Sequence, residues 1–204
     1  MRHSLLSLWT GALLTASAGL ATAASAQASA RPTAEQMKAS LAAHTADFDY
    51  LLGDWEFTGQ NRQYGKIHGF WSAARLVEGP QILDEYRVVG DSGETYYVTN
   101  TLRVYNAALD LWELVSLEGP FGLQNVGTGR KVGAEIHIEQ RFGVLSPDSS
   151  LLRIRYTNIR PDGFTWSADR SGDGGKTWTA DYQRLEVHRI GPPRTIAPMT
   201  RAKK

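Results

Sequence analysis

"FDYLLGDWEFTG", residues 48–59, is the stretch where the chain changes from helix-like to strand-like sequence. Before it, "TAEQMKASLAAH" is rich in Ala, and Thr33 stands three residues before Gln36, which is the spacing of a capping box at a helix start. After it, aromatic and β-branched residues alternate with polar ones. Gly53 and Trp55 are therefore expected at the mouth of a first strand, directly after a short helix.

The chain beyond this point is predicted to form ten strands on short connections. Gly, Pro, Asn and Asp separate the alternating runs, and no helical periodicity interrupts them. Closing such a meander protects the edges of many strands in one small domain. We therefore expect an all-β fold, a single antiparallel meander closed as a barrel of about ten strands with a short N-terminal helix. The expected strands cover residues 54–61, 66–76, 81–89, 94–105, 111–118, 122–130, 133–142, 151–159, 163–170 and 177–188.

The N-terminus has the composition of a secretory signal peptide. Arg2 is basic, residues 5–20 are mostly apolar, and small residues follow. Cleavage is expected after Ala26, with Ala30 as the other candidate. A membrane anchor is the alternative, but the apolar stretch is short and broken by Thr, Ser and Gly. No other stretch is apolar for long enough to span a bilayer, so no membrane span is expected.

Composition narrows the location and the partners of the protein. The 204 residues contain no Cys, which excludes thiolate metal sites and thiol nucleophiles and favours a bacterial periplasm or a secreted product. Lys and Arg number 22 against 21 Asp and Glu, and this balance argues against nucleic acid as a partner. The predicted organisation is a signal peptide (1–26), an N-terminal segment with the helix (27–46), the barrel (47–190) and a disordered tail (191–204).

"SGDGGKTW", residues 171–178, resembles the Asp-box S-x-D-x-G-x-T-W of sialidase-type propellers. A sialidase needs several such boxes, many more strands, an arginine cluster and a Tyr nucleophile. One box in a chain of this length cannot build that fold. We therefore interpret the motif as a hairpin turn in which Asp173 accepts backbone N–H bonds and the glycines adopt positive φ.

Several sequence segments together resemble those of a group of exported bacterial lipocalin-like (calycin-type) barrels of unknown function. They are the F-D-[FY]-L-x-G-x-W start at Phe48, "NTLRVYNAALDLWELV" and the single D-G-G-K-T-W hairpin, and the resemblance covers residues 46–189. The same segments are also similar, more distantly, to those of nitrobindin-like haem barrels. The resemblance implies a lipocalin-like fold in which Trp55 closes the barrel base. It implies no particular chemistry.

A small barrel either fills itself with side chains or holds one apolar or planar ligand, and both alternatives are open here. Arg103 alternates with Leu102 and Val104, so either the arginine or the aliphatic pair faces inward. An inward Arg103 would need a carboxylate or a bound anion, because an unpaired buried charge is very costly. The candidate ligand-binding residues are Trp55, Arg103, Trp112, Tyr156, Trp166 and Trp178.

The alternatives to simple ligand binding have weaker support. A haem-binding barrel would use one proximal histidine on a late strand, and the candidates are His188 and His137. No histidine pair has zinc-ligand spacing, and no nucleophile motif occurs, so no metal site and no catalytic residue is predicted. Asp84 and Glu85 are adjacent in a strand and point to opposite faces.

The expected function is therefore binding of a small hydrophobic or planar molecule, without a cofactor. The first alternative is a haem protein. The second is an enzyme acting on a small lipid-like substrate, although the lack of a catalytic constellation favours a binding protein.

Overall fold

A computed structural model describes residues 31–76 and 79–196 of the chain. The predicted signal peptide and both candidate cleavage sites lie outside the described residues. Within them, no helix combines the length and the apolar character that crossing a membrane requires.

The predicted N-terminal helix is present as α1 (Ala34–His44). The hydroxyl of Thr33 accepts a hydrogen bond from the backbone N–H of Gln36 (3.2 Å), and the Gln36 side chain accepts one from the Thr33 N–H (2.8 Å). This reciprocal pair is the predicted capping box. On the barrel side, Ser40 hydrogen-bonds the Tyr105 hydroxyl (2.7 Å) and Asp110 (2.7 Å), which attaches α1 to the barrel.

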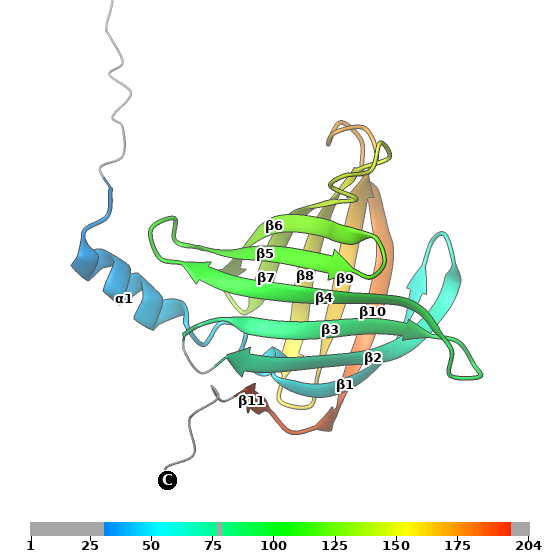
Figure 1. The fold of residues 1–204 in the computed structure, drawn as a ribbon, viewed down its shortest axis with the longest axis horizontal. Helices are drawn as coiled ribbons and strands as arrows, with labels where there is room; N and C mark the ends of the chain where they lie inside the picture. The colour runs from blue at the N-terminus through cyan, green and yellow to red at the C-terminus, as the bar shows by residue number, and fades with distance from the viewer. Residues whose placement is uncertain (1–30, 77–78, 197–204) are drawn as a thin grey trace, which may run out of the picture. The chain divides into compact units, whose positions relative to one another are not determined.

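Ten antiparallel strands form one closed barrel (Figure 1). β1 pairs with both β2 and β10, and this double pairing closes the sheet. The predicted fold class is confirmed, and each predicted strand matches an observed one within a few residues. The strands are β1 (Gly53–Asn61), β2 (Gly65–Leu76), β3 (Ile82–Val89), β4 (Thr95–Asn106), β5 (Leu111–Glu118), β6 (Gly122–Val132), β7 (Glu135–Phe142), β8 (Ser150–Arg160), β9 (Gly163–Ser171) and β10 (Thr179–Gly191).

An eleventh strand, β11 (Arg194–Ile196), runs parallel to the end of β2. Pairing of β1 with β2 starts at Gly53 opposite Ala73, so residues 74–76 of β2 have a free edge on that side. β11 occupies this edge, and Arg194 contacts Asp54 and Ser72. The predicted disordered tail begins at residue 191, whereas the structure has Gly191 as the last residue of β10 and residues 194–196 in β11; residues 197–204 lie outside the described part.

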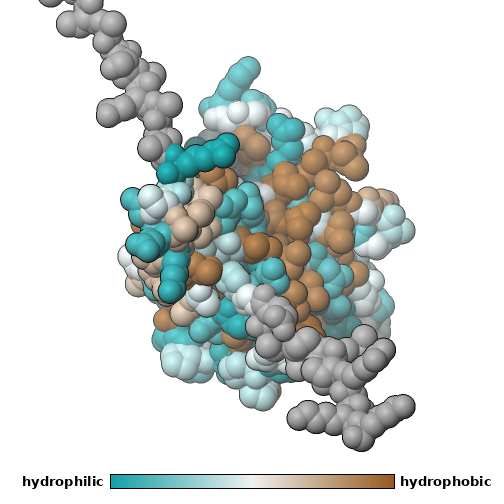
Figure 2. Space-filling model, turned by 60° about the vertical axis from the view of Figure 1, so that its left-hand side comes forward, coloured by the Kyte–Doolittle hydropathy of each residue, from teal (hydrophilic) through white to brown (hydrophobic). Residues whose placement is uncertain are grey.

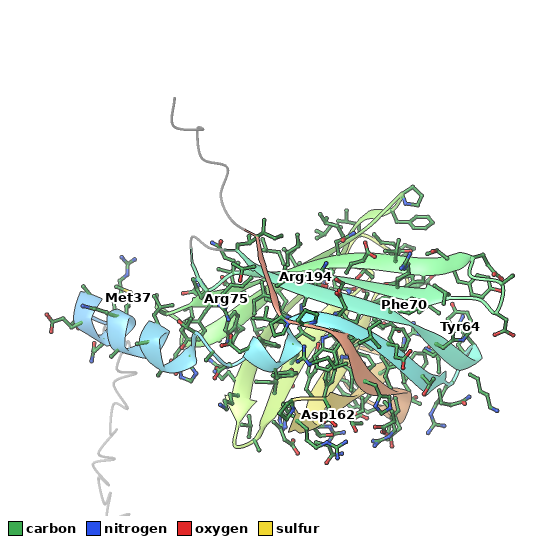
Figure 3. All side chains as sticks on the ribbon, turned by 90° about the horizontal axis from the view of Figure 1, so that it is seen from below. Met37, Tyr64, Phe70, Arg75, Asp162 and Arg194 are labelled. Carbon is green, nitrogen blue, oxygen red and sulfur yellow. The ribbon has the colours of Figure 1, made fainter. Side chains whose placement is uncertain are left out.

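The two ends of the barrel differ. At the closed end, the 3-10 helix η1 (Asp49–Leu51) and Phe48 cover a set of fully buried aromatic side chains. The open end carries the β1–β2, β3–β4, β5–β6 and β7–β8 connections. Figure 3 shows Met37 of α1 and Tyr64 of the β1–β2 hairpin at opposite ends of the molecule.

Trp55 is the central side chain of the closed end. It is 0% exposed, and its indole N–H donates to the carbonyl of Leu51 (2.7 Å). The guanidinium of Arg189 lies 3.9 Å from the ring centroid and donates to the carbonyls of Tyr50 (2.9 Å) and Leu52 (2.7 Å). Burial lowers the pKa of Arg189 from its usual value. Trp55 and Arg189 thus fix the segment that enters β1 against the last strand of the barrel.

The "SGDGGKTW" motif is the hairpin between β9 and β10. The carboxylate of Asp173 accepts hydrogen bonds from the backbone of Lys176 (3.1 Å) and Thr177 (2.9 Å), and from the Thr177 hydroxyl (2.7 Å). Gly174 and Gly175 have φ of 74° and 91°, a region that glycine adopts without strain. These contacts form the hairpin turn that the sequence predicts.

Replacing Asp173 with Ala is expected to lower the melting temperature, because several donors of the hairpin lose their acceptor. Hydrogen bonds from Thr177 and Ser171 lower the pKa of Asp173 from 3.8 to about 2. A depressed pKa means that the carboxylate stabilises the fold above about pH 4 and loses that effect as the pH falls toward 2. The difference in melting temperature between wild type and Asp173→Ala should therefore shrink at pH 2.

The matched control is Asp162→Ala in the β8–β9 turn. Its carboxylate is 85% exposed and lies 3.9 Å from the side chain of Arg160. This variant should melt like the wild type. An Asp173→Ala protein that does so as well would contradict a structural role for the hairpin carboxylate.

Candidate functional site

A cavity of about 1260 Å³ occupies the barrel interior. It reaches from the connections of the open end, including Tyr64, Phe121 and Leu145, down to Trp71, Arg103 and Tyr156. This volume lies above the roughly 300–1,000 Å³ of typical ligand pockets, so it is large enough for one small molecule. Of the two alternatives that the sequence leaves open, a cavity of this size favours a lumen with room for a ligand.

One side of the cavity is polar. Asp84, Thr101, Ser116 and Asn125 are successive cross-strand neighbours on β3 to β6, and Phe142 of β7 connects this row to Ser150 on β8. We call the polar members of this set the polar row; all are buried, with exposed fractions of 2–7%. Only one pair within it is hydrogen-bonded, Thr101 Oγ1 with Ser116 Oγ at 2.9 Å. The polar row gives the cavity an edge of oxygen and nitrogen atoms that Phe142 interrupts between Asn125 and Ser150.

The same strands turn aliphatic side chains outward. Leu83, Leu102, Val115 and Val126 are cross-strand neighbours on β3 to β6, each one residue away from a member of the polar row or from Arg103. Leu83, Val115 and Val126 are 36–39% exposed. A hydrophobic area is visible on the outer surface in Figure 2. The usual alternation of a half-exposed strand is thus reversed on this part of the barrel.

The bottom of the cavity contains a buried ion pair. Arg103 and Asp84 are 3% and 2% exposed, and their charged groups are in direct contact. Asp84 Oδ1 also accepts from the indole N–H of Trp71 (2.8 Å), and Arg103 Nη2 donates to the hydroxyl of Tyr156 (3.2 Å). We call these four residues the floor network. Each buried charge in it has the opposite charge beside it, which is the requirement for burying either one.

Aromatic rings line the cavity wall next to the floor network. Trp71 lies 5.4 Å from Tyr86 and 5.9 Å from Tyr156 between ring centroids, and Trp166 lines the cavity beside them. Burial raises the pKa of Tyr156 and of Tyr86. Both phenols therefore stay protonated near neutral pH and offer hydrogen-bond donors. A planar molecule could stack on these rings with its polar edge toward the polar row.

Half of the predicted ligand-binding residues line the cavity. Arg103, Tyr156 and Trp166 do, whereas Trp55 and Trp112 pack at the closed end. Trp178 lies outside the lumen, because its indole bonds the Gly175 carbonyl (3.1 Å) of the hairpin. Its ring stacks on the outward-facing Arg153 of β8, at 4.0 Å from the guanidinium carbon.

Neither predicted haem ligand faces the lumen. His137 lies between the inward-facing Ile136 and Ile138 on β7 and contacts Glu135 on the outside (2.7 Å). His188 follows the inward-facing Val187 on β10 and is exposed. These residues do not fit a haem held inside the barrel. Among residues 31–76 and 79–196, no cluster of three His, Cys, Asp or Glu side chains could hold a metal ion.

The sequence interpretation did not select several lumen residues. Trp71, Tyr86, Asn125, Ser150, Arg170 and Tyr182 all line the cavity. The useful signal was present in β4, where placing Arg103 inside also places Thr101 and Thr99 inside. Extending that choice to the neighbouring strands requires the register of their pairing, which the sequence alone does not specify.

No protein-family model matches this chain, and a search of curated proteins finds no match either.

Proposed function

We propose that this chain is an exported barrel protein, periplasmic or secreted, that binds a small hydrophobic or planar molecule in its lumen. The observation that carries the proposal is the cavity of about 1260 Å³, with aromatic rings at its floor and a polar row along one side. Soluble barrels of this size hold one small ligand when their interior is not filled by side chains. The signal-like N-terminal sequence supports export.

The reversed alternation on β3 to β6 supports a binding role. Thr101, Ser116 and Asn125 face inward and Leu102 and Val115 face outward, while Trp112 and Leu114 on the same inner face stay buried. These polar side chains contribute less apolar burial to the lumen than aliphatic side chains at the same positions would. The polar row is instead suited to recognition of a polar edge on a ligand, since a few placed polar groups fix the orientation of a ligand in an otherwise apolar pocket.

The test is to fill the lumen. Ala168 is 2% exposed and lines the cavity from β9, so Ala168→Phe places a ring inside it. 1-Pyrenebutanol, a planar neutral probe, should bind the wild type and quench its tryptophan fluorescence. The Ala168→Phe variant should bind it at least about tenfold more weakly.

Asn100→Phe is the matched control, because Asn100 is exposed on the outer face of β4. This variant should bind the probe like the wild type. A wild-type protein that leaves the probe unbound, or an Ala168→Phe variant with unchanged affinity, would contradict binding in the lumen.

An enzyme acting on a small lipid-like substrate is the second candidate. In its favour, three ionisable residues, Asp84, Arg103 and Tyr156, converge at the cavity floor. Against it, both carboxylate oxygens of Asp84 are engaged, one by Trp71 and one by Arg103, so this carboxylate is not free to act as a base. The floor network therefore supports binding better than proton transfer.

A further inference from the structure

Arg170 is a second lumen cation, and its surroundings differ from those of Arg103. It lies on β9 and lines the cavity. Its Nε donates to Ser150 (3.1 Å) and its Nη1 to the hydroxyl of Tyr182 (2.8 Å). Within the described residues, no carboxylate lies at ion-pairing distance from this guanidinium and Nη2 has no acceptor. The charge of Arg170 is thus held by neutral hydroxyls alone.

The charges around the cavity leave Arg170 unbalanced. The carboxylate deepest in the cavity, Asp84, is already paired with Arg103. The other acidic residues that line it, Asp91, Glu94 and Asp148, are exposed at the connections of the open end. Lys66 also lines the cavity, but it is exposed at the open end, so below that rim Arg170 carries the one positive charge that no carboxylate of the described residues neutralises.

The surroundings of Arg170 also form a polar site. Ser150 is 3% exposed and is the last member of the polar row. Two strands away in that row, Asn125 is 7% exposed and its Oδ1 has no hydrogen-bond partner in the described part of the chain. The ring of Tyr182 lies under the guanidinium of Arg170 at 4.9 Å and limits its movement. The guanidinium is therefore positioned before any ligand binds.

We propose that the lumen ligand carries a carboxylate and that Arg170 binds it, with the aromatic rings of the floor contacting the apolar part of the molecule. This inference rests on the proposed function. A guanidinium matches a carboxylate with two parallel N–H donors, and in a partly enclosed cavity such a charge-assisted pair is stronger than a neutral hydrogen bond. The unpartnered oxygen of Asn125 would accept from a hydroxyl elsewhere on the ligand.

The experiment compares two probes that differ only in their head group, 1-pyrenebutanoic acid and 1-pyrenebutanol. At pH 7 the wild type should bind the acid about tenfold or more tightly than the alcohol, as measured by tryptophan quenching. Arg170→Gln should lose this preference while keeping its affinity for the alcohol. Arg170→Lys retains the charge but not the two-donor geometry, and should keep part of the preference.

Arg153→Gln is the control, because Arg153 is on the outer face of the neighbouring strand and contacts Glu139 and Trp178 there. It should leave both affinities unchanged. Equal binding of acid and alcohol by the wild type, or a preference that survives in Arg170→Gln, would overturn the carboxylate assignment and leave the proposed function standing. Failure of the wild type to bind either probe would overturn both. If Arg170→Gln does not fold, the comparison of Arg170→Lys with the wild type decides the assignment.

Discussion

Replacing Asp84 with Asn is expected to lower the free energy of unfolding by about 3–5 kcal/mol, because it leaves the buried Arg103 without its counter-charge. Both residues are almost inaccessible to water, at 2% and 3% exposure, so solvent cannot replace the lost carboxylate charge. The single oxygen of the Asn side chain can accept from Trp71 only if its NH2 group faces Arg103, so the variant removes the charge and one hydrogen-bond acceptor together. Urea unfolding followed by tryptophan fluorescence measures it.

Two further variants make this result specific. Glu139→Gln removes the carboxylate of the exposed Glu139–Arg153 pair (3.3 Å), and an exposed pair of this kind contributes at most about 1 kcal/mol. The double variant Asp84→Leu with Arg103→Met removes both buried charges and should recover much of the stability lost in Asp84→Asn. If Asp84→Asn lowered the free energy of unfolding as little as Glu139→Gln does, the Asp84–Arg103 pair would not be buried from solvent as the structure has it.

Trp55→Ala is the second substitution with a large expected effect, a loss of about 3–5 kcal/mol in the free energy of unfolding. The side chain is fully buried, its ring contacts Phe164 at 5.1 Å between centroids, and Arg189 covers it. Removing it creates a void at the closed end and leaves the Leu51 carbonyl without the indole donor. Thermal and urea unfolding would both report the loss.

Trp178→Ala is the matched control, since it removes the same side chain from a half-buried position outside the barrel. We expect it to cost less than half of the Trp55→Ala effect. Equal effects of the two substitutions would mean that the closed end does not depend on Trp55 more than the hairpin depends on its own tryptophan.

The sequence was sufficient for the order and length of the strands. Turn residues separate the strands at nearly every boundary, and Asp91-Ser92-Gly93 and Pro161-Asp162-Gly163 are clear cases. The capping box at Thr33 located the helix start for the same reason, because each of these signals is local. Local chemistry of the backbone does not depend on where the rest of the chain lies.

The lumen was only partly predictable. A period of two divides β4 into two sets, with Leu102 and Val104 on one face and Arg103 and Tyr105 on the other, but it does not say which set is inside. Hydrophobicity alone would place Leu102 inside, and the structure has the opposite. The deciding interaction, Arg103 with Asp84, joins β4 to β3 and is visible only once their register is known.

The position of Trp178 and the strand β11 were missed for a related reason. Trp178 precedes β10 and bonds backward to the hairpin, so the alternation of the strand does not apply to it. β11 exists because β1 begins opposite Ala73 and leaves the last three residues of β2, residues 74–76, with a free edge, which is a property of the closed sheet. The local composition of these two segments indicates neither the position of Trp178 nor the strand β11.

The reversed alternation of β3 to β6 also bears on how the chain reaches this particular pairing. A slip of one residue in these strands would bring Leu83, Leu102 and Val115 inside, but it would also turn the buried Ile82, Trp112 and Leu114 outward. Apolar burial by itself therefore does not choose clearly between the two arrangements of these strands. Arg103 and Asp84 would then be carried to the outside, where their attraction is weak. The floor network is therefore a discriminator between two foldings of one sequence, and its removal should reduce the uniqueness of the native state.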